Sequence, residues 1–407
     1  MRIKVGVIFG GESVEHEVSI ISAIQAMNKI DEEKYEVIPI YITKDREWYT
    51  GDMLKDIEVY QDFSLIKKYS DNVVLYYKDG SYVLQKKHGL FKSVVKELDI
   101  AFPIVHGTNV EDGVLQGYLQ TIGIPYVGPN VYAAVVGQDK AFMKDVWASA
   151  NLPIKNYVWF YDNDYRQDPE EVIKKVSKLK YPVIVKPATT GSSVGINVCD
   201  NESSLKEAID EAVQYDSKIV VEEVVEDLKE VNIAVMGNYE HQKVSEIEEV
   251  LSGNKFLTYT DKYIGGGKTK GKLKTPVKSA SKGMASASRK LPADLDEDVR
   301  KEVERVAKEA FKVLGSSGNS RIDFLIDRKD NKVYLNEINS IPGSLAFYLW
   351  DAKDINFTKV LDDMINIGIK DYKKRVSKTH SFETNILAGF ASNGGLKGAK
   401  GVKGKLR

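Results

Sequence analysis

Four polar residues near the end of the chain are spaced for metal or phosphate chemistry. Arg321 and Asp323 lie in the apolar run RIDFLID, and Glu337 and Asn339 lie in the run VYLNEIN. The two runs flank the polar segment RKDNK, a pattern that predicts a β-hairpin. Because side chains alternate between the faces of a strand, each pair of polar residues shares one face of its own strand.

The length of the turn decides whether these two pairs meet. A five-residue turn, 328–332, places Asp323 opposite Glu337. The same turn places Arg321 opposite Asn339, whereas a four-residue turn puts the two pairs on opposite faces. The first arrangement gathers two carboxylates, an amide oxygen and a guanidinium, and such hard oxygen ligands suit Mg²⁺ bound to nucleotide phosphates. The alternative is a solvated hairpin face with ordinary charge pairs, which are common.

A glycine-rich loop follows another expected strand. Residues 187–195 read PATTGSSVG, directly after an apolar strand that ends at Lys186. Such a loop can offer successive backbone N–H groups to phosphate oxygens, and Lys186 can reach the same phosphates. The spacing does not match G-x-x-x-x-G-K-[ST], which disfavours a P-loop nucleotide hydrolase. The alternative is a plain turn.

Acidic residues cluster in three further segments. The run VVEEVV, residues 220–225, and Glu230 suit an edge between domains that presents backbone groups to adenine and a carboxylate to ribose. The alternative for this run is a charged edge strand. Segments 12–17 and 106–113 each follow an expected strand, where α/β proteins bind ligands. A carboxylate of the first could hold a substrate ammonium group, and Glu111 also suits a helix start.

The composition is that of a soluble globular enzyme. The 407 residues carry a net charge of −1, so we expect neither nucleic acid nor a membrane surface as a partner. The single cysteine, Cys199, excludes an intramolecular disulfide and fits a cytoplasmic location. The N-terminal apolar run is too short for a signal peptide or a membrane span, and no other segment is long and apolar enough to insert into a bilayer.

Apolar runs and helical spacing alternate along the chain, which predicts an α/β protein with a parallel sheet in its first part. The strands and helices expected there are 3–9, 19–29, 35–42, 99–105 and 113–122. Those expected in the second part are 140–150, 157–160, 169–178, 182–186 and 219–225. We expect domains at 1–130, 131–226 and 227–375, then an extension at 376–407.

Two segments are expected to be irregular. Residues 264–293 hold eight Lys and Arg and neither Asp nor Glu, so we predict a mobile loop there within the third domain. The extension is rich in Gly and Lys from residue 394 onward, and we expect it to be disordered in part.

Blocks of sequence over residues 9–343 resemble the D-alanine–D-alanine ligase family of ATP-grasp enzymes. Their order and spacing together make the resemblance specific. The blocks are FGGESVEHEVS, HGTNVEDGVLQG, IPYVGPNVYAAVVGQDK, PVIVKPATTGSSVG, VVEEVVEDLKEVNIAVMG, YTDKY, RIDFLID and LNEINSIPG. The resemblance implies an ATP-grasp fold of three α/β domains, with a Rossmann-like N-terminal domain and nucleotide bound between the central and C-terminal domains.

The family's functional residues can be carried over position by position. The residues implied to bind ATP are Lys140, Lys186, Ser193, Glu222, Glu223, Val225, Glu230 and Lys262. Asp323, Glu337 and Asn339 are implied to hold two Mg²⁺ ions, with Mn²⁺ as a substitute. The implied catalytic residues are Glu15, Ser192, Tyr263, Arg321 and Gly343, and the implied substrate-binding residues are Glu15, His106, Glu111, Tyr348 and Leu349.

The implied reaction joins two amino acids through an acyl phosphate, and D-alanyl-D-alanine for peptidoglycan and the cell wall is the first expectation. Phosphoryl transfer needs positioning and charge neutralisation, which the lysines and Mg²⁺ supply. The tetrahedral intermediate needs donors for its oxyanion, here Arg321 and the N–H of Gly343. By the same resemblance the partners are ATP and amino acids, in a homodimer.

Three positions depart from the family pattern. Val110 stands where the family usually has glycine, and an enlarged segment separates Tyr263 from Pro292. By count, Tyr348 in the run SLAFYLW takes the place of the serine that binds the second substrate's carboxylate. The segment PGSLAFYLW favours a second hypothesis, an ATP-grasp ligase with a different acceptor. A third hypothesis is a nucleotide-binding regulator without activity, against which the complete set of metal and oxyanion residues argues.

Overall fold

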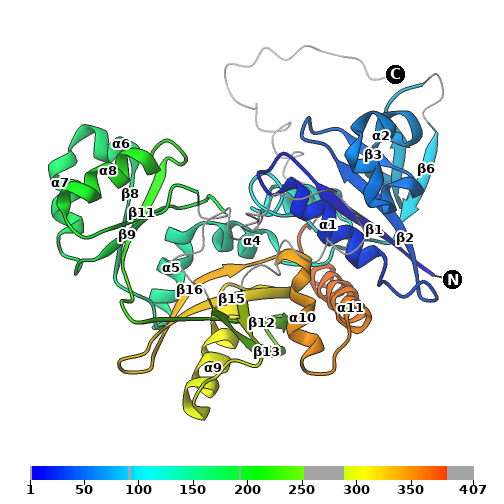
Figure 1. The fold of residues 1–407 in the computed structure, drawn as a ribbon. Coiled ribbons are helices and arrows are strands. Elements are labelled where there is room, and N and C mark those ends of the chain that lie inside the picture. The colour runs from blue at the N-terminus through cyan, green and yellow to red at the C-terminus, as the bar shows by residue number, and fades with distance from the viewer. Residues whose placement is uncertain (1, 90–92, 192–193, 252–287, 383–407) are drawn as a thin grey trace, which may run out of the picture.

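Three β-sheets organise the chain (Figure 1). The structure is a computed structural model that describes residues 2–89, 93–191, 194–251 and 288–382. We name the sheets, in chain order, the first, the central and the third sheet. They have seven, four and five strands, and each buries apolar side chains against helices. The α/β class predicted from the sequence is confirmed.

The first sheet is parallel only in part. Its strand order is β6-β5-β4-β3-β2-β1-β7, and β1, β2 and β7 are parallel as predicted. The other neighbours pair antiparallel, which was not predicted. Asp79 and Gly80 join β4 to β5 with positive φ angles of 49° and 91°, as tight hairpins require. The strands are β1 Ile3–Gly10, β2 Tyr35–Ile42, β3 Trp48–Thr50, β4 Asp71–Lys78, β5 Ser81–Lys86, β6 Val94–Leu98 and β7 Ile100–Pro103.

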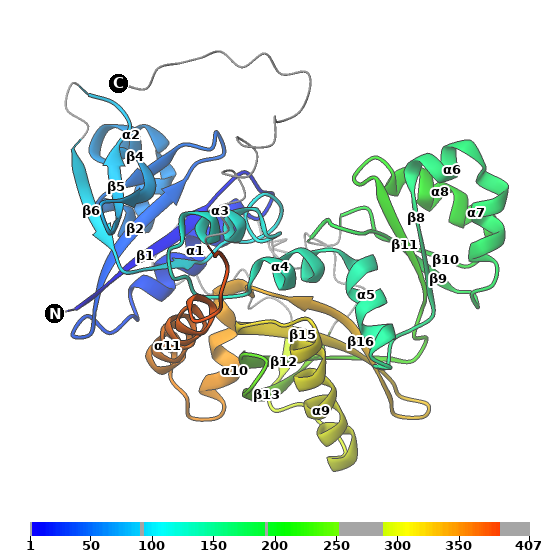
Figure 2. The same cartoon turned by 180° about the vertical axis from the view of Figure 1, so that it is seen from behind.

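The helices near the first sheet come from both ends of the chain. Figure 2 shows α11 beside α1 and α3, although its residues follow the third sheet in sequence. Trp350, Leu361 and Ile365 of the C-terminal helices are buried in the same apolar cluster as β1 and β2. The C-terminal segment therefore completes the core of the first sheet. The helices are α1 His16–Met27, α2 Phe63–Tyr69, α3 Val114–Ile122, α10 Phe347–Asp351 and α11 Phe357–Val376.

The central sheet is fully antiparallel, in the order β10-β9-β11-β8. Helices α7 and α8 cover it with an apolar cluster that includes Val172, Ile209 and Val221. Helices α4 (Val131–Gln138) and α5 (Lys140–Ser149) lead into it from the first sheet. Its own elements are β8 Tyr157–Tyr161, α6 Asp162–Gln167, α7 Pro169–Val176, β9 Val183–Pro187, β10 Asn197–Cys199, α8 Glu202–Ala212 and β11 Lys218–Glu223.

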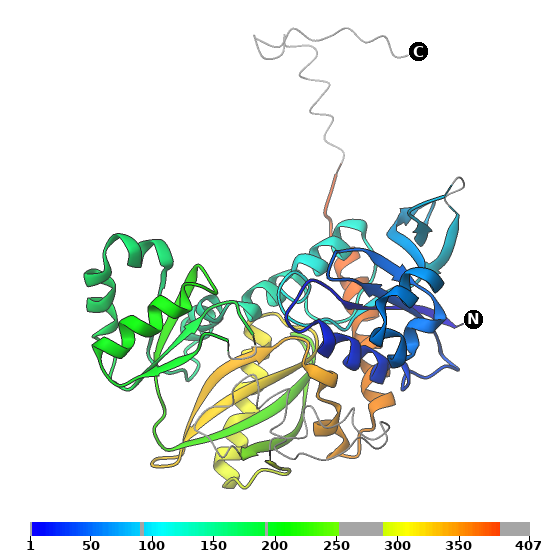
Figure 3. The same ribbon diagram turned by 45° about the horizontal axis from the view of Figure 1, so that its top comes forward.

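The third sheet lies between the other two (Figure 3). Val231, Ile233 and Val235 of β12 face helix α9 in an apolar core, so the residues between them face the other way. This other face is polar near Glu230 and Asn232, which line a cavity, and apolar near Ala234 and Met236, which pack in the cluster of the first sheet. The elements are β12 Leu228–Gly237, β13 Gln242–Leu251, β14 Ser288–Lys290, α9 Glu297–Val313, β15 Gly318–Asp327 and β16 Lys332–Asn339.

The end of the predicted mobile loop belongs to this sheet. Ser288–Lys290 form β14, which pairs with β13, and the N–H of the buried Ala293 donates to Ile247 O at 2.8 Å. The expectation of a loop up to residue 293 was therefore wrong, because a strand of three residues leaves no periodicity to detect. Residues 264–287, like 383–407 of the predicted extension, lie outside the described residues. Among the described helices, none is long and apolar enough to span a membrane.

Candidate active site

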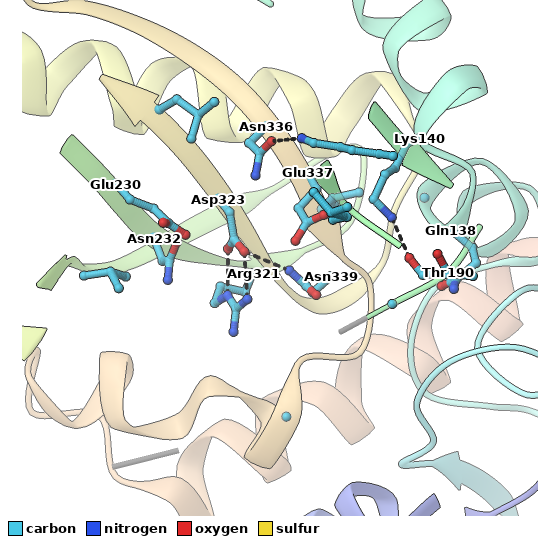
Figure 4. A pocket seen from close by; sticks show the side chains of 18 of the residues that line it. Gln138, Lys140, Thr190, Glu230, Asn232, Arg321, Asp323, Asn336, Glu337 and Asn339 are labelled. Carbon is cyan, nitrogen blue, oxygen red and sulfur yellow. Dashed lines mark hydrogen bonds and ion pairs between the residues drawn. The ribbon is translucent and has the colours of Figure 1, made fainter. Parts of the chain in front are cut away.

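One cavity of about 310 Å³ gathers residues from all three sheets (Figure 4). Its floor is the polar face of the third sheet, and its walls come from the ends of β9 and β11, from α4 and α5, and from loops of the first sheet. The predicted site residues that line it are Glu15, His106, Glu111, Lys140, Lys186, Glu222, Glu223, Val225, Glu230, Arg321, Asp323, Glu337, Asn339 and Gly343. Sequence positions more than 300 residues apart thus meet in one place.

Of the six other predicted residues, the structure describes two. Ser192, Ser193, Lys262 and Tyr263 lie outside the described residues. Tyr348 and Leu349 are described but do not line the cavity. The side chain of Leu349 is fully buried in the core of the first sheet, so it does not reach the cavity, and a substrate-binding role for this residue stays a prediction.

The hairpin brings its two polar pairs together through a β-bulge. β15 ends at Asp327 and β16 begins at Lys332, so the turn has four residues rather than the predicted five. The pairs Asp323–Glu337 and Arg321–Asn339 nevertheless form, because the register shifts after Asp323. A bulge inserts one extra residue into a strand, and here the extra residue is Asn336.

This bulge decides which face Glu337 occupies. Leu335 pairs with Phe324 and both are buried in the apolar core. Without the extra residue Asn336, strand alternation would turn Glu337 into that core. With it, Asn336 and Glu337 both line the cavity, and the patch of two carboxylates, an amide and a guanidinium predicted from the sequence is confirmed.

Arg321 and Asp323 form a bidentate ion pair on the cavity floor. The guanidinium donates from Nε to Oδ1 and from Nη2 to Oδ2, each at 2.7 Å, and Asn339 Nδ2 donates to the same carboxylate at 3.2 Å (Figure 4). Burial alone would lower the pKa of Arg321, but Asp323 raises it well above its ordinary value. The guanidinium therefore stays charged and can stabilise a developing anion.

The oxygen donors fit a hard divalent cation. The carboxylates of Asp323 and Glu337 and the amide of Asn339 project from neighbouring strand positions into one cavity, and oxygen ligands of this kind suit Mg²⁺. Within the described ranges no cluster of three His, Cys, Asp or Glu is close enough to bind a metal. A cation here would therefore use these two carboxylates, the amide and oxygens of a bound ligand.

A buried ion cluster lies at the end of β9 and β11. Lys186 contacts Glu222 Oε1 and also donates to Asn336 Oδ1 at 3.2 Å. Lys144 of α5 contacts the other oxygen of Glu222 at 2.6 Å. Burial alone would raise the pKa of Glu222, but the two lysines hold it below its ordinary value. Sequence reasoning missed both Lys144 and Asn336, although Lys144 follows Lys140 by one helical turn, a spacing that puts both on one face.

The start of α5 and the glycine-rich loop form a cationic end. Asp139 caps the helix by accepting from the N–H groups of Ala141 and Phe142, and Lys140 Nζ donates to Thr190 O at 2.8 Å. The N–H of Thr189 donates to Asp216 Oδ2 at 2.6 Å. That N–H is therefore not directed at a phosphate, and the predicted cradle is limited to later residues of the loop.

A partly apolar slot borders the ion cluster. Ile184, Val225 and Leu325 line it together with other aliphatic side chains, which suits the flat face of a base. Glu223 at its edge accepts from Asn156 Nδ2 and from the N–H of Lys180, each at 3.1 Å. The carboxylate of Glu230 also lines the cavity, on the strand β12.

Loops of the first sheet meet the third sheet at the opposite end. The buried Glu111 accepts from Gly107 N–H at 3.0 Å, and from Ser340 Oγ and Ile341 N–H at 2.9 Å each. Burial raises the pKa of Glu111 to about 7. His106 Nδ1 lies 2.8 Å from the carbonyl oxygen of Ile341, and burial lowers the pKa of His106. These contacts hold the segment that leads to Gly343.

The family departure at Val110 has a local structural explanation. Gly11 has a φ of +102°, and a Cβ there would lie 2.4 Å from Val110 Cγ1. The buried Val110 therefore packs directly on the backbone of the loop that carries Glu15. Compared with the glycine usual in the family, the Val110 side chain fills space beside Gly11 and does not enter the cavity.

Tyr348 contacts the cavity only through other residues. Its hydroxyl donates to Glu248 Oε1 at 2.7 Å, and Arg289 lies over its ring at 4.9 Å. Glu248 also contacts Arg289 at 3.4 Å and accepts from Asn232 at 3.0 Å. Glu248, Arg289 and Asn232 do line the cavity. Tyr348 therefore does not line the cavity itself, and its binding of the second substrate stays a prediction.

The site and fold together define an ATP-grasp enzyme. Two antiparallel sheets enclose a nucleotide-sized cavity with lysines at one end and a carboxylate–guanidinium patch on its floor. Comparison with protein families agrees with this class. The family models described as D-ala D-ala ligase N-terminus and D-ala D-ala ligase C-terminus match residues 4–129 and, in two segments, residues 146–287 and 281–366.

Curated relatives match along nearly the whole chain. The D-alanine–D-alanine ligase of Thermosipho africanus is 38% identical over 386 residues, covering 95% of this chain and 98% of that protein. The enzyme of the same name from Natranaerobius thermophilus is 36% identical over 387 residues, covering 94% and 99%. The chain therefore belongs to the D-alanine–D-alanine ligase family, and the resemblance seen in the sequence is confirmed.

Solved structures of related proteins share the fold. The D-alanine–D-alanine ligase of Coxiella burnetii superposes with a TM-score of 0.76 at 26% identity, covering 97% of this chain and 99% of that one. The VanG D-Ala:D-Ser ligase of Enterococcus faecalis gives a TM-score of 0.75 at 29% identity, covering 90% and 100%. Both similarities extend over all three sheets.

Proposed function

We propose that this enzyme is an ATP-dependent D-alanine–D-alanine ligase that makes the dipeptide for peptidoglycan precursors and so serves cell wall growth and cell shape. The observation that carries the proposal is the convergence of Arg321, Asp323, Glu337 and Asn339 on one cavity with Lys140 and Lys186. A carboxylate substrate takes the γ-phosphoryl group of ATP, and the amine of the second amino acid then displaces phosphate from the acyl phosphate. Both steps need charge neutralisation at the phosphates.

The cavity offers a group for each part of this reaction. We assign the phosphates to Lys140 and Lys186, and adenine to the aliphatic slot beside Glu223, because all of these line the cavity. Asp323, Glu337 and Asn339 would hold Mg²⁺, one or two ions, with Mn²⁺ able to replace it. When bound, the cation neutralises phosphate charge and polarises the transferred group.

The opposite end of the cavity suits the amino acids. Glu15 lies beside Gly107 and Gly191, where its carboxylate can bind the first substrate's ammonium group. We assign Ser192 and Tyr263 to the same network and Ser193 and Lys262 to the phosphates, on family resemblance. We assign Arg321 and the N–H of Gly343 to the oxyanion of the tetrahedral intermediate, because both residues line the cavity.

A second candidate is a ligase of the same chemistry with another acceptor. It is favoured by the cluster of Tyr348, Glu248 and Arg289, which puts a guanidinium and a carboxylate at the acceptor end. A panel of D- and L-amino acids, with phosphate release measured and products identified by mass spectrometry, separates the two. D-alanyl-D-alanine as the dominant product supports the first function. A different dipeptide supports the second, and no phosphate release with any amino acid refutes both.

We also propose the domain division 1–130, 131–226 and 227–375, a cytoplasmic location and a homodimer. The location follows from the use of ATP. The dimer is supported by exposed apolar side chains on adjacent helices, namely Val114 of α3 and Tyr132 and Val135 of α4. Sedimentation velocity of the wild-type protein tests it, and a monomer at micromolar concentration would contradict it.

A further inference from the structure

Two lysines share one buried carboxylate, but they differ in what else they can reach. Lys186 on β9 and Lys144 on α5 contact opposite oxygens of Glu222, the second-to-last residue of β11. Lys144 and Glu222 are 1% and 2% exposed. Lys186 lines the cavity, whereas Lys144 does not. The carboxylate therefore separates a lysine that can meet a ligand from one that cannot.

We propose that Lys144 is a positioning residue for nucleotide binding, acting through Glu222. In the free enzyme Lys186 is committed to Glu222 and Asn336. When Lys186 turns to a phosphate, Lys144 remains as the counter-ion of Glu222. The buried carboxylate is therefore never left without a positive partner. The inference rests on the proposed binding of ATP in this cavity and adds a residue that lies outside it.

The physical basis is the asymmetry of buried ion pairs. Removing one partner of a buried pair is costly, because the other charge then has neither water nor a counter-ion. Without Lys144, Glu222 would have Lys186 as its remaining lysine partner and would compete with the phosphates for it. We expect the dissociation constant for ADP to rise by about tenfold to a hundredfold in Lys144→Met, which keeps the side-chain volume and removes the charge.

The chain offers a matched control in Lys218. This lysine is also buried, at 6% exposed, and it also joins β11 to α5, through an ion pair with Asp139 at 2.5 Å. It does not line the cavity. Lys218→Met should therefore lower the melting temperature as Lys144→Met does, while leaving the dissociation constant for ADP within about threefold of wild type.

Calorimetric titration of ADP with Mg²⁺ into the full-length variants tests the proposal. In Lys144→Met, turnover at saturating ATP should fall far less than the affinity for ADP. A residue that takes part in the chemical step would instead lower turnover at saturating ATP. In the Glu222→Gln background, Lys144→Met should change the dissociation constant for ADP by less than about threefold, because no carboxylate then competes for Lys186. If Lys144→Met does not fold, Lys144→Gln, which keeps an N–H donor, takes its place.

Each outcome either supports or overturns the positioning role of Lys144. Weaker ADP binding on Lys144→Met in the wild-type background but not in the Glu222→Gln background supports the positioning role. Unchanged affinity in Lys144→Met, equal weakening in Lys218→Met, or equal weakening by Lys144→Met in both backgrounds overturns it. Failure of the wild-type enzyme to bind ADP at all would refute the proposed function itself, which distinguishes the two failures.

Discussion

Glu111 should make the stability of this enzyme depend on pH, and a single substitution should remove its contribution to that dependence. The carboxylate is buried where loops of the first sheet meet the end of β16, and it accepts three hydrogen bonds. Burial, opposed by these bonds and assisted by the charge of Glu15, raises its pKa to about 7 from an ordinary value of 4.5. The folded state therefore binds a proton more tightly than the unfolded chain does.

The sign and size of the effect follow from this difference. The proton stabilises the fold fully below pH 4.5, and its contribution is lost as the pH rises through about 7. At 1.36 kcal/mol for each pKa unit, Glu111 should lower the free energy of unfolding by about 3 kcal/mol across that interval. This loss adds to whatever other groups contribute.

Glu111→Gln removes the titration and changes one hydrogen bond. The amide oxygen can still accept from Ser340 and Ile341, but the NH₂ group then faces the N–H of Gly107, at a cost of about 1 kcal/mol. We expect the variant to be less stable than wild type by about 1 kcal/mol at pH 4 and more stable by about 2 kcal/mol at pH 8. Urea unfolding from pH 4 to pH 8 measures both. A difference between the two proteins that does not change with pH would refute this reasoning.

Three further substitutions test the reaction site. Glu337→Ala should reduce turnover by more than about a hundredfold with little change in melting temperature. The control Asp330→Ala, in the turn of the same hairpin, should leave turnover unchanged. Equal turnover in the wild type, Glu337→Ala and Asp330→Ala would contradict the metal assignment. Arg321→Lys loses the bidentate geometry and should lower kcat by about 10²–10³ in steady-state assays, and a normal kcat would exclude it from oxyanion stabilisation. Tyr348→Phe removes a bond to the Glu248 carboxylate and should change the acceptor KM by about tenfold to a hundredfold while sparing the first-site KM; equal shifts in both constants would show a general structural effect.

Much of the fold follows from local pattern. The parallel strands β1 and β2 and helix α5 lie close to their predicted bounds, because long apolar runs and a capping Asp139 are visible in the sequence. The antiparallel part of the first sheet and the strand β14 were not predicted. Their strands are short or amphipathic, and their pairing depends on neighbours that a local pattern does not name.

The candidate site shows the same division. Residue types and spacing were enough to bring most of the predicted residues into one cavity, yet the hairpin was predicted with the wrong turn. The bulge at Asn336 corrected the register, and a bulge cannot be read from alternation because the extra residue interrupts it. Lys144 was missed for another reason, since a charged residue on a helix usually faces water and its burial is known only once Glu222 is in place.

The acceptor end shows why counting along a motif does not by itself place the Tyr348 side chain. Ser344, Leu345 and Ala346 all have φ between 46° and 51°, a left-handed conformation that costs about 1–2 kcal/mol for each such residue. The strain is opposed by contacts from other elements, because Ser22 Oγ accepts from Ser344 N–H at 2.8 Å and Asn319 Nδ2 donates to Leu345 O at 2.6 Å. These contacts join α1 of the first sheet to β15 of the third. Contacts between two sheets thus fix the backbone turn that directs Tyr348 toward Glu248. We therefore expect acceptor selectivity to change on substitution of Ser22 or Asn319 as well as on substitution within the segment SLAFYLW.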